Sequence, residues 1–242
     1  MAVVPEPVAD TAWLAADPAV ERVALGADSW VDVVRGFLPG ADALHHELVD
    51  GLTWEQGDVF RYERTIDLPR LQARQTGRRV HAALAEAGTW LDRHYRVRFD
   101  DGALARYRDG NDSVGWHRDR EMRWLDDTLI GIVTLGAQRP FVLRPMGPKR
   151  YGDDDWRDVI DVSPASGDLL VLGGRCQAAW LHAVPKTRGP VGDRISVQYR
   201  WTSKRGRPDT NPGFYEARRF GQGRSGAGGP GARPGTRPGP RR

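Results

Sequence analysis

The sequence predicts a mainly β domain with flanking helices (α+β), in which two sheets form a jelly roll. Many short apolar or alternating runs are separated by Gly- and Pro-containing turns, as in double-sheet β folds. Only two segments carry a helical stripe of apolar residues. The 242 residues, 39% of them hydrophobic, suit one domain with a real core and additional tails.

The predicted helices lie in the first half of the chain. Pro39-Gly40 introduces a helix of about ten residues with Leu44 and Leu48 in its apolar stripe. A single strand is expected over 59–70, ended by Pro69. The second helix is expected over 77–95, where the apolar positions are Val80, Leu84, Ala87 and Leu91. We interpret that stripe as core, so these helices would cover an outer face of the sheet.

The remaining predicted elements are strands. Their ranges are 104–109, 128–135, 141–145, 157–164, 167–174, 180–186 and 194–203. The run TLIGIVTL at 128–135 is apolar and β-branched enough for a buried strand. GAQR at 136–139 is expected to turn it back into the next strand as a hairpin. Ligands would bind at the open mouth of such a jelly roll.

Composition and charge divide the chain into three parts: an N-terminal arm (1–24), a folded domain (25–202) and a disordered Gly/Pro/Arg-rich tail (203–242). The tail holds ten Lys or Arg and two acidic residues, a charge of +8, so a total of +4 leaves 4 − 8 = −4 on the rest. Such a tail either holds a polyanion through phosphate contacts or is only a solvated extension. The single Cys176 excludes an internal disulfide.

The expected location is the cytoplasm, and the expected state is a monomer. One cysteine suits a reducing compartment. The start, MAVVPEPVAD, lacks the basic and apolar regions of a secretion signal, and no apolar run approaches the roughly 18 residues of a membrane span. No membrane partner is therefore expected.

A His-x-Asp pair, His117 and Asp119, follows an Asp-Gly turn signal. In extended backbone, residues two apart point to the same face, so an imidazole and a carboxylate could reach one metal ion. Two His and one carboxylate form the ligand set of non-haem Fe(II) oxygenases. His182 is the best downstream candidate for the second His. A pair of exposed polar residues is the alternative interpretation.

Two arginines, Arg194 and Arg200, lie in the alternating run DRISVQYRW. Their even spacing places both guanidiniums on the face opposite Ile195, Val197 and Tyr199. The guanidinium fork binds carboxylates in bidentate fashion, which would suit a dianionic cosubstrate near a metal. Solvated strand arginines are the alternative.

Taken together, seven segments resemble the AlkB family of Fe(II)/2-oxoglutarate-dependent dioxygenases. They are PRL (69–71), YRDG (107–110), DSVGWHRDRE (112–121), TLGAQRPFVLRP (134–145), SGDLLVLGG (166–174), WLHAVPK (180–186) and RISVQYR (194–200). The order is that of the family. The resemblance implies a double-stranded β-helix core, with Fe(II), 2-oxoglutarate and O2 as cofactor and cosubstrates.

The resemblance also implies residue roles. His117, Asp119 and His182 would hold Fe(II) and form the catalytic centre. Tyr107 and Arg194 would bind the distal carboxylate of 2-oxoglutarate, with Arg200 near its metal-bound end. Glu121 would contact the substrate base.

The implied reaction is oxidative dealkylation of N-alkylated bases such as 1-methyladenine and 3-methylcytosine. It would act on single- or double-stranded DNA, with RNA possible, and release aldehyde, succinate and CO2.

Three departures from the family pattern keep alternatives open. Family members carry Asn where this chain has Ala105 and Ser196, which would weaken cosubstrate binding by about 1 kcal/mol for each lost hydrogen bond. The segment after Leu71 is shorter than the family's nucleotide-recognition lid. One alternative is therefore the same chemistry on RNA, a protein or a small molecule. The other is a catalytically weak nucleic-acid-binding module.

Overall fold

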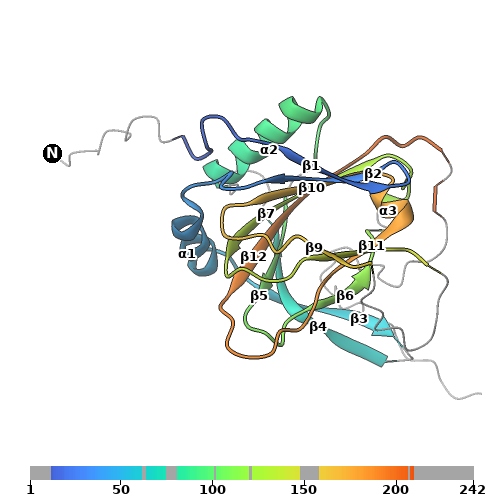
Figure 1. Ribbon diagram of the computed structural model, residues 1–242. Helices are drawn as coiled ribbons and strands as arrows, with labels where there is room; N and C mark the ends of the chain where they lie inside the picture. The colour runs from blue at the N-terminus through green and yellow to red at the C-terminus, as the bar shows by residue number, and fades with distance from the viewer. Residues whose placement is uncertain are drawn as a thin grey trace, which may run out of the picture.

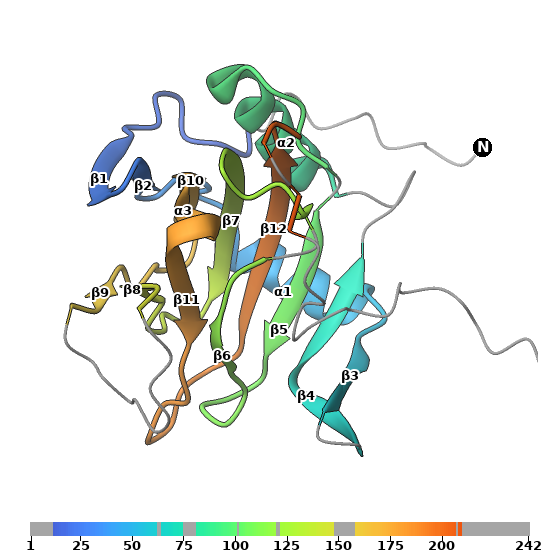
Figure 2. The same ribbon diagram turned by 90° about the vertical axis from the view of Figure 1, so that its right-hand side faces the viewer.

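A computed structural model describes residues 12–61, 64–74, 81–100, 102–119, 122–147, 158–206 and 208–209. Two antiparallel sheets form the framework of this part of the chain, one with eight strands and one with four. Figure 1 and Figure 2 show the two sheets facing each other, with α1 and α2 outside the larger one. The predicted jelly roll with flanking helices is confirmed.

The larger sheet has the spatial order β1 (Glu21–Gly26), β2 (Ser29–Val34), β10 (Leu169–Gly174), β7 (Thr128–Gly136), β12 (Arg194–Thr202), β5 (Ala103–Tyr107), β4 (Arg64–Arg74) and β3 (Glu55–Arg61). The smaller sheet has the order β6 (Val114–His117), β11 (Trp180–Val184), β8 (Val142–Pro145) and β9 (Ile160–Asp161). The helices are α1 (Ala41–Gly51), α2 (Ala82–Tyr95) and the single turn α3 (Cys176–Ala179).

Two apolar clusters lie on opposite faces of the larger sheet. One joins the sheet to α1 and α2, and includes Ile195, Val197 and Tyr199 of β12. The other fills the space between the sheets. All but the last residue of β7 are buried, because this strand contributes side chains to both clusters. The alternation along β12 therefore leaves Arg194 and Arg200 on the face toward the smaller sheet.

The helix predictions need one correction. α1 lies where the sequence predicts it, with Leu44 and Leu48 buried. α2 begins at Ala82, because His81 is an extended N-cap whose ring accepts a hydrogen bond from the Ala83 N–H. The predicted start at Gly77 is wrong, and Val80 lies outside the described residues.

The single strand predicted over 59–70 is instead a pair of antiparallel strands, β3 and β4. Pro69 does not end β4, which continues to Arg74. The register shifts between Gln56 and Asp58 of β3, and pairing with β5 begins only at Leu71. Pro69 therefore lies at a bulge, where a missing N–H removes no ladder hydrogen bond.

The hairpin predicted between 128–135 and 141–145 is also wrong. β7 pairs with β10 and β12, whereas β8 pairs with β11 and β9 in the other sheet. The connection crosses between the sheets, and Gly136 begins it with a φ of 80°. A side chain at Gly136 would meet the Asp193 carbonyl, so glycine is required there for two reasons.

The predicted boundaries of the arm and tail stay predictions. β1, which crosses the predicted boundary between arm and domain at residue 24, pairs with β2 in the sheet. Most of 203–242 lies outside the described residues. None of the helices in the described ranges is long and apolar enough to span a membrane.

We expect Leu91→Ala to destabilise the fold by about 3 kcal/mol, as measured by urea unfolding. Leu91 is fully buried on α2, and its side chain lies directly over Gly131 of β7. Truncation leaves a cavity between helix and sheet. Thr89→Ala, on the exposed side of α2, should change stability by less than about 0.5 kcal/mol. Equal effects of the two substitutions would contradict this packing.

Candidate metal centre

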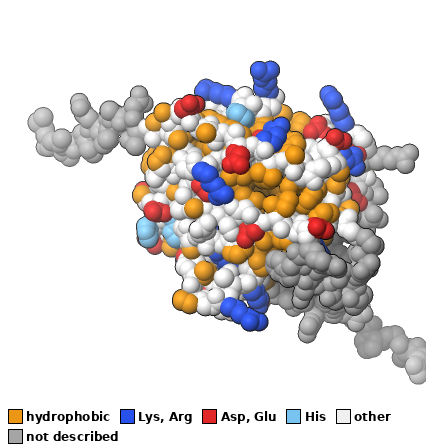
Figure 3. All heavy atoms as spheres, viewed as in Figure 1, with side chains coloured by type: hydrophobic (Ala, Val, Ile, Leu, Met, Phe, Trp, Pro, Cys, Tyr) orange, Lys and Arg blue, Asp and Glu red, His pale blue; other side chains and the backbone are white. Residues whose placement is uncertain are grey.

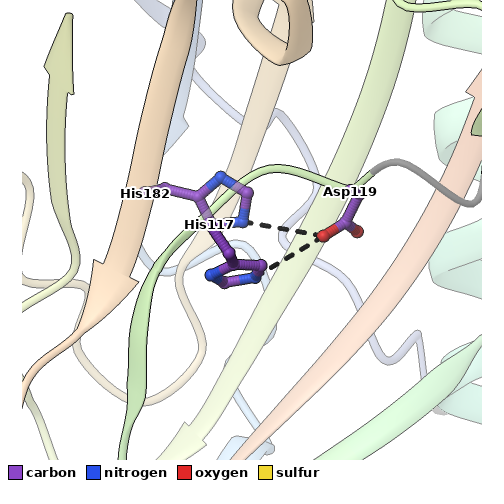
Figure 4. A group of neighbouring side chains, drawn as sticks. All are labelled: His117, Asp119 and His182. Carbon is purple, nitrogen blue, oxygen red and sulfur yellow. Dashed lines mark ion pairs between the residues drawn. The ribbon is translucent and has the colours of Figure 1, made fainter. Parts of the chain in front are cut away.

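Three predicted ligands meet between the sheets. One nitrogen from each of His117 and His182 and one carboxylate oxygen of Asp119 lie within 4.8 Å of one another. The distances to Asp119 Oδ1 are 3.5 Å from His117 Nε2 and 3.9 Å from His182 Nε2. Figure 4 shows both imidazoles directed toward the carboxylate.

Strand register brings the two histidines together. β6 and β11 are antiparallel, and His117 is the direct cross-strand partner of His182. Directly opposed residues have side chains on the same face and in contact. The two imidazole ring centroids are 4.2 Å apart, and the Phe141 ring stacks with His182 at a centroid distance of 5.7 Å. The sheet therefore places side by side two histidines that are 65 positions apart in the sequence.

The Asp119 carboxylate has a different partner for each oxygen. Oδ1 faces the imidazoles, while Oδ2 accepts a hydrogen bond of 2.7 Å from Arg200 Nε. Burial alone would raise the pKa of Asp119, but the charge of Arg200 and its hydrogen bond lower it below its ordinary value. The carboxylate is therefore ionised at neutral pH, as a metal ligand must be.

Both histidines are neutral at pH 7. Burial lowers the pKa of His182 to about 3, and burial also lowers the pKa of His117. His117 Nδ1 lies 2.9 Å from the Gly115 carbonyl oxygen, which can only accept, so Nδ1 carries the proton. His117 Nε2 then presents its lone pair toward Asp119. This donor set suits Fe(II).

Arg194 lies on the same face of β12 as Arg200 and is completely buried. Nη2 donates to Thr134 Oγ1 at 3.3 Å, whereas Nε and Nη1 have no hydrogen-bond partner among the described residues. Burial lowers the pKa of Arg194 to about 10, which leaves it charged at pH 7. A buried guanidinium with two unused donors is unfavourable unless an anion binds it. A carboxylate of 2-oxoglutarate fits this requirement.

Tyr107 is the cross-strand neighbour of Arg194, with the guanidinium carbon 5.8 Å from its ring centroid. The two positions where the family carries Asn, Ala105 and Ser196, also face each other on β5 and β12. Thr134 of β7 is the partner of Ser196 on the other side. The predicted anion site therefore has Tyr107 on one side and small residues at the Asn positions of the family, and weakened cosubstrate binding stays a prediction.

Two buried polar residues near the site were not predicted from the sequence. Arg139 donates to the backbone carbonyls of Asp109, Asp112 and Pro185, which joins the loops that follow β5 and β11. Gln177 accepts a hydrogen bond from the Asp119 backbone N–H. A charged or amide side chain beside apolar residues is the only sequence signal for either. Glu121, the predicted substrate contact, lies outside the described residues.

Two imidazoles and a carboxylate, together with a buried and incompletely bonded arginine on the inner face of β12, define a class: non-haem Fe(II) oxygenases that take an anionic cosubstrate. Residues 41–210 match the model of the 2OG-Fe(II) oxygenase superfamily. The chain belongs to this superfamily, and its two histidines, carboxylate and buried arginine fit Fe(II) and 2-oxoglutarate. The non-catalytic alternative is thereby disfavoured.

Curated relatives place it in the AlkB-like branch. The alpha-ketoglutarate-dependent dioxygenase alkB homolog 3 of Mus musculus is 33% identical over 200 residues, covering 74% of this chain and 69% of the relative. The DNA oxidative demethylase ALKBH2 of Arabidopsis thaliana is 33% identical over 129 residues, covering 46% and 41%. The chain spans 66% of the Bos taurus alkB homolog 3, about two thirds of its length.

Among solved structures, HygX from Streptomyces hygroscopicus with nickel, 2-oxoglutarate and hygromycin B bound has a TM-score of 0.49 and 14% identity, covering 70% of this chain and 81% of HygX.

We expect Arg194→Met to raise the Kd for 2-oxoglutarate by about 100-fold or more, because a buried charge-assisted pair is lost. Mn(II) affinity should stay within about twofold, since Arg194 bonds to none of the three predicted ligands. Titration calorimetry without O2 measures Mn(II) binding to the metal-free protein, and then 2-oxoglutarate binding to the Mn(II)-loaded protein. Arg98→Met, an exposed arginine, is the control. Unchanged 2-oxoglutarate affinity in Arg194→Met would exclude this residue as the anion site.

Proposed function

We propose that this enzyme removes alkyl groups from N-alkylated bases of the 1-methyladenine and 3-methylcytosine type in DNA. The observation that carries the proposal is the similarity to an alkB homolog across 74% of the chain. A second relative is named a DNA oxidative demethylase. The residues that hold the proposed metal and anion sites all lie within the matched region.

We propose that His117, Asp119 and His182 hold Fe(II), and that Arg194 with Tyr107 binds the distal carboxylate of 2-oxoglutarate. The bound iron, with O2 and 2-oxoglutarate, supplies the oxidising power to hydroxylate a C–H bond. The N-methyl group becomes N–CH2OH, while 2-oxoglutarate becomes succinate and CO2. Loss of formaldehyde then returns the nitrogen to its unmodified state.

The protein's part in this reaction is to orient ligands and limit water. Asp119 and His182 are 7% and 6% exposed, and the imidazole rings lie between the two sheets. A base inside a duplex cannot reach such a position, so it must leave the stack. The energy required is lower for alkylated or unpaired bases, which favours damaged over intact sites.

The excess of basic residues in the C-terminal part of the sequence supports a nucleic-acid substrate. On the face seen in Figure 3, basic and acidic side chains are interspersed around apolar ones. The basic excess lies in the sequence from residue 203 onward. We propose that arginines of this tail contact the phosphates of the substrate, whereas the jelly roll performs the chemistry.

The second candidate keeps the reaction and changes the substrate to RNA, a protein or a small molecule. The observation that favours it is the short connection between β4 and α2. β4 ends at Arg74 and α2 begins at Ala82, so the connection between them is residues 75–81. A lid that clamps a base has little chain available there.

The experiment that tests the proposal measures succinate from the Fe(II)-loaded protein with 2-oxoglutarate and a single-stranded oligonucleotide containing 1-methyladenine. We expect the methylated oligonucleotide to stimulate succinate formation and adenine to be restored in equal amount. His182→Ala should lose both, because the iron would keep only two protein ligands.

The comparison oligonucleotide has the same sequence without the methyl group. Succinate formation that is equal with both oligonucleotides, and no restored adenine, would reject the DNA substrate and leave the second candidate. Absence of succinate under every condition would reject the assignment of the site.

A second prediction concerns the tail. Replacing all seven arginines of residues 210–242 with glutamine should weaken binding to an unmodified single strand and flatten its salt dependence. Each lost phosphate contact lowers the slope of log K against log salt by about 0.7. Fluorescence anisotropy at several salt concentrations measures this slope. Arginine-to-lysine replacement keeps the charge and should keep the slope, and an unchanged slope in the glutamine variant would exclude a role for the tail.

A further inference from the structure

Gln177 is a completely buried amide in the single turn α3, five residues before His182. Its neighbours in the chain include Cys176 and Trp180, which belong to the apolar cluster between the sheets. A polar side chain in such surroundings is unfavourable unless its hydrogen bonds are made. The hydrogen bonds of Gln177 therefore indicate its structural role.

The amide oxygen of Gln177 accepts a hydrogen bond of 2.9 Å from the backbone N–H of Asp119. This N–H lies beyond the end of the strand ladder, because β6 ends at His117 and its pairing with β11 ends at His117 and His182. Asp119 is buried as well, so an unbonded N–H there would cost about 1–3 kcal/mol. Gln177 takes the place of a strand partner at this position.

The amide nitrogen of Gln177 makes no comparable hydrogen bond. Gln177 Nε2 has no acceptor among the described residues. A residue present only to fill space would be apolar here, since an unpartnered amide N–H destabilises the fold. The bond to Asp119 is therefore what the glutamine supplies that an apolar residue of similar size cannot.

A second contact joins the same two segments. Arg118, between the two predicted ligands of the His-x-Asp pair, donates to the carbonyls of Gln177 and Ala178, each at 3.4 Å. α3 continues directly into β11, which carries His182. The position of Asp119 is thus coupled to the strand that holds the second histidine.

We propose that Gln177 is a positioning residue for the metal centre: its amide oxygen fixes the backbone of Asp119 relative to His182 and so sets the spacing of the ligands. This inference rests on the proposed metal site. Partners that orient metal ligands typically change metal affinity by about 10- to 100-fold when they are removed.

The test compares Mn(II) affinity in four full-length proteins, measured from the electron paramagnetic resonance signal of the free ion without O2 or 2-oxoglutarate. Gln177→Met removes the acceptor and keeps the volume, and we expect its Kd to rise by about 10- to 100-fold. Cys176→Ala changes packing in the same turn without touching Asp119, so its Kd should stay within about twofold of the wild type whatever its Tm. His182→Ala should bind no Mn(II) at this site.

Two further results separate the possible failures. If the wild type and His182→Ala bind Mn(II) equally, the metal site itself is wrong. If only His182→Ala loses binding and Gln177→Met matches the wild type, the metal site stands and the role of Gln177 is overturned.

Amide hydrogen exchange in the wild-type protein gives a measurement that does not depend on a variant folding. The Asp119 N–H should be protected in the metal-free protein, because its hydrogen bond to Gln177 does not need the metal. Rapid exchange of that amide would also overturn the proposal.

Discussion

The candidate metal centre depends on the carboxylate of Asp119, whose two oxygens have different neighbours. Asp119 presents Oδ1 to a pair of neutral imidazoles and Oδ2 to Arg200, 2.7 Å away. Without Arg200 the buried carboxylate would lose its counter-charge. Oδ1 and the unprotonated Nε2 of His117, 3.5 Å apart, are both acceptors, so a cation between them would satisfy both. The arrangement keeps the carboxylate ionised and leaves one oxygen available for a metal.

Electrostatics also divide the space between the sheets into two regions. Near Asp119, one carboxylate oxygen and two neutral imidazoles face one another, with the guanidiniums of Arg200 and Arg70 nearby. Near Arg194 a buried guanidinium has two unused donors, and the side chains on neighbouring strands are small or neutral. A cation therefore suits the first region and an anion the second. A divalent metal would therefore bind near Asp119, and a carboxylate of the cosubstrate would bind near Arg194.

Much of this could be predicted from local sequence signals. The His-x-Asp pair, the alternating strand with two arginines and the helical stripe of α2 each depend on a fixed period. The structure brings His117 and Asp119 together, leaves both arginines on one face of β12 and buries the last three stripe residues of α2, although that helix begins at Ala82 and not at Gly77. The hairpin between 128–135 and 141–145 failed because antiparallel neighbours in sequence can enter different sheets, and pairing across a jelly roll leaves no local signal. Gln177 was missed for the same reason: its partner, Asp119, is 58 positions away.

The most direct measurement is a crystal structure of the full-length protein with Mn(II) and 2-oxoglutarate, grown without O2. The account predicts one anomalous peak between the Nε2 atoms of His117 and His182 and Oδ1 of Asp119. It also predicts that the distal carboxylate of 2-oxoglutarate accepts hydrogen bonds from Arg194 Nε or Nη1. A metal bound elsewhere, or a cosubstrate whose carboxylates do not reach Arg194, would contradict the assignment of both sites.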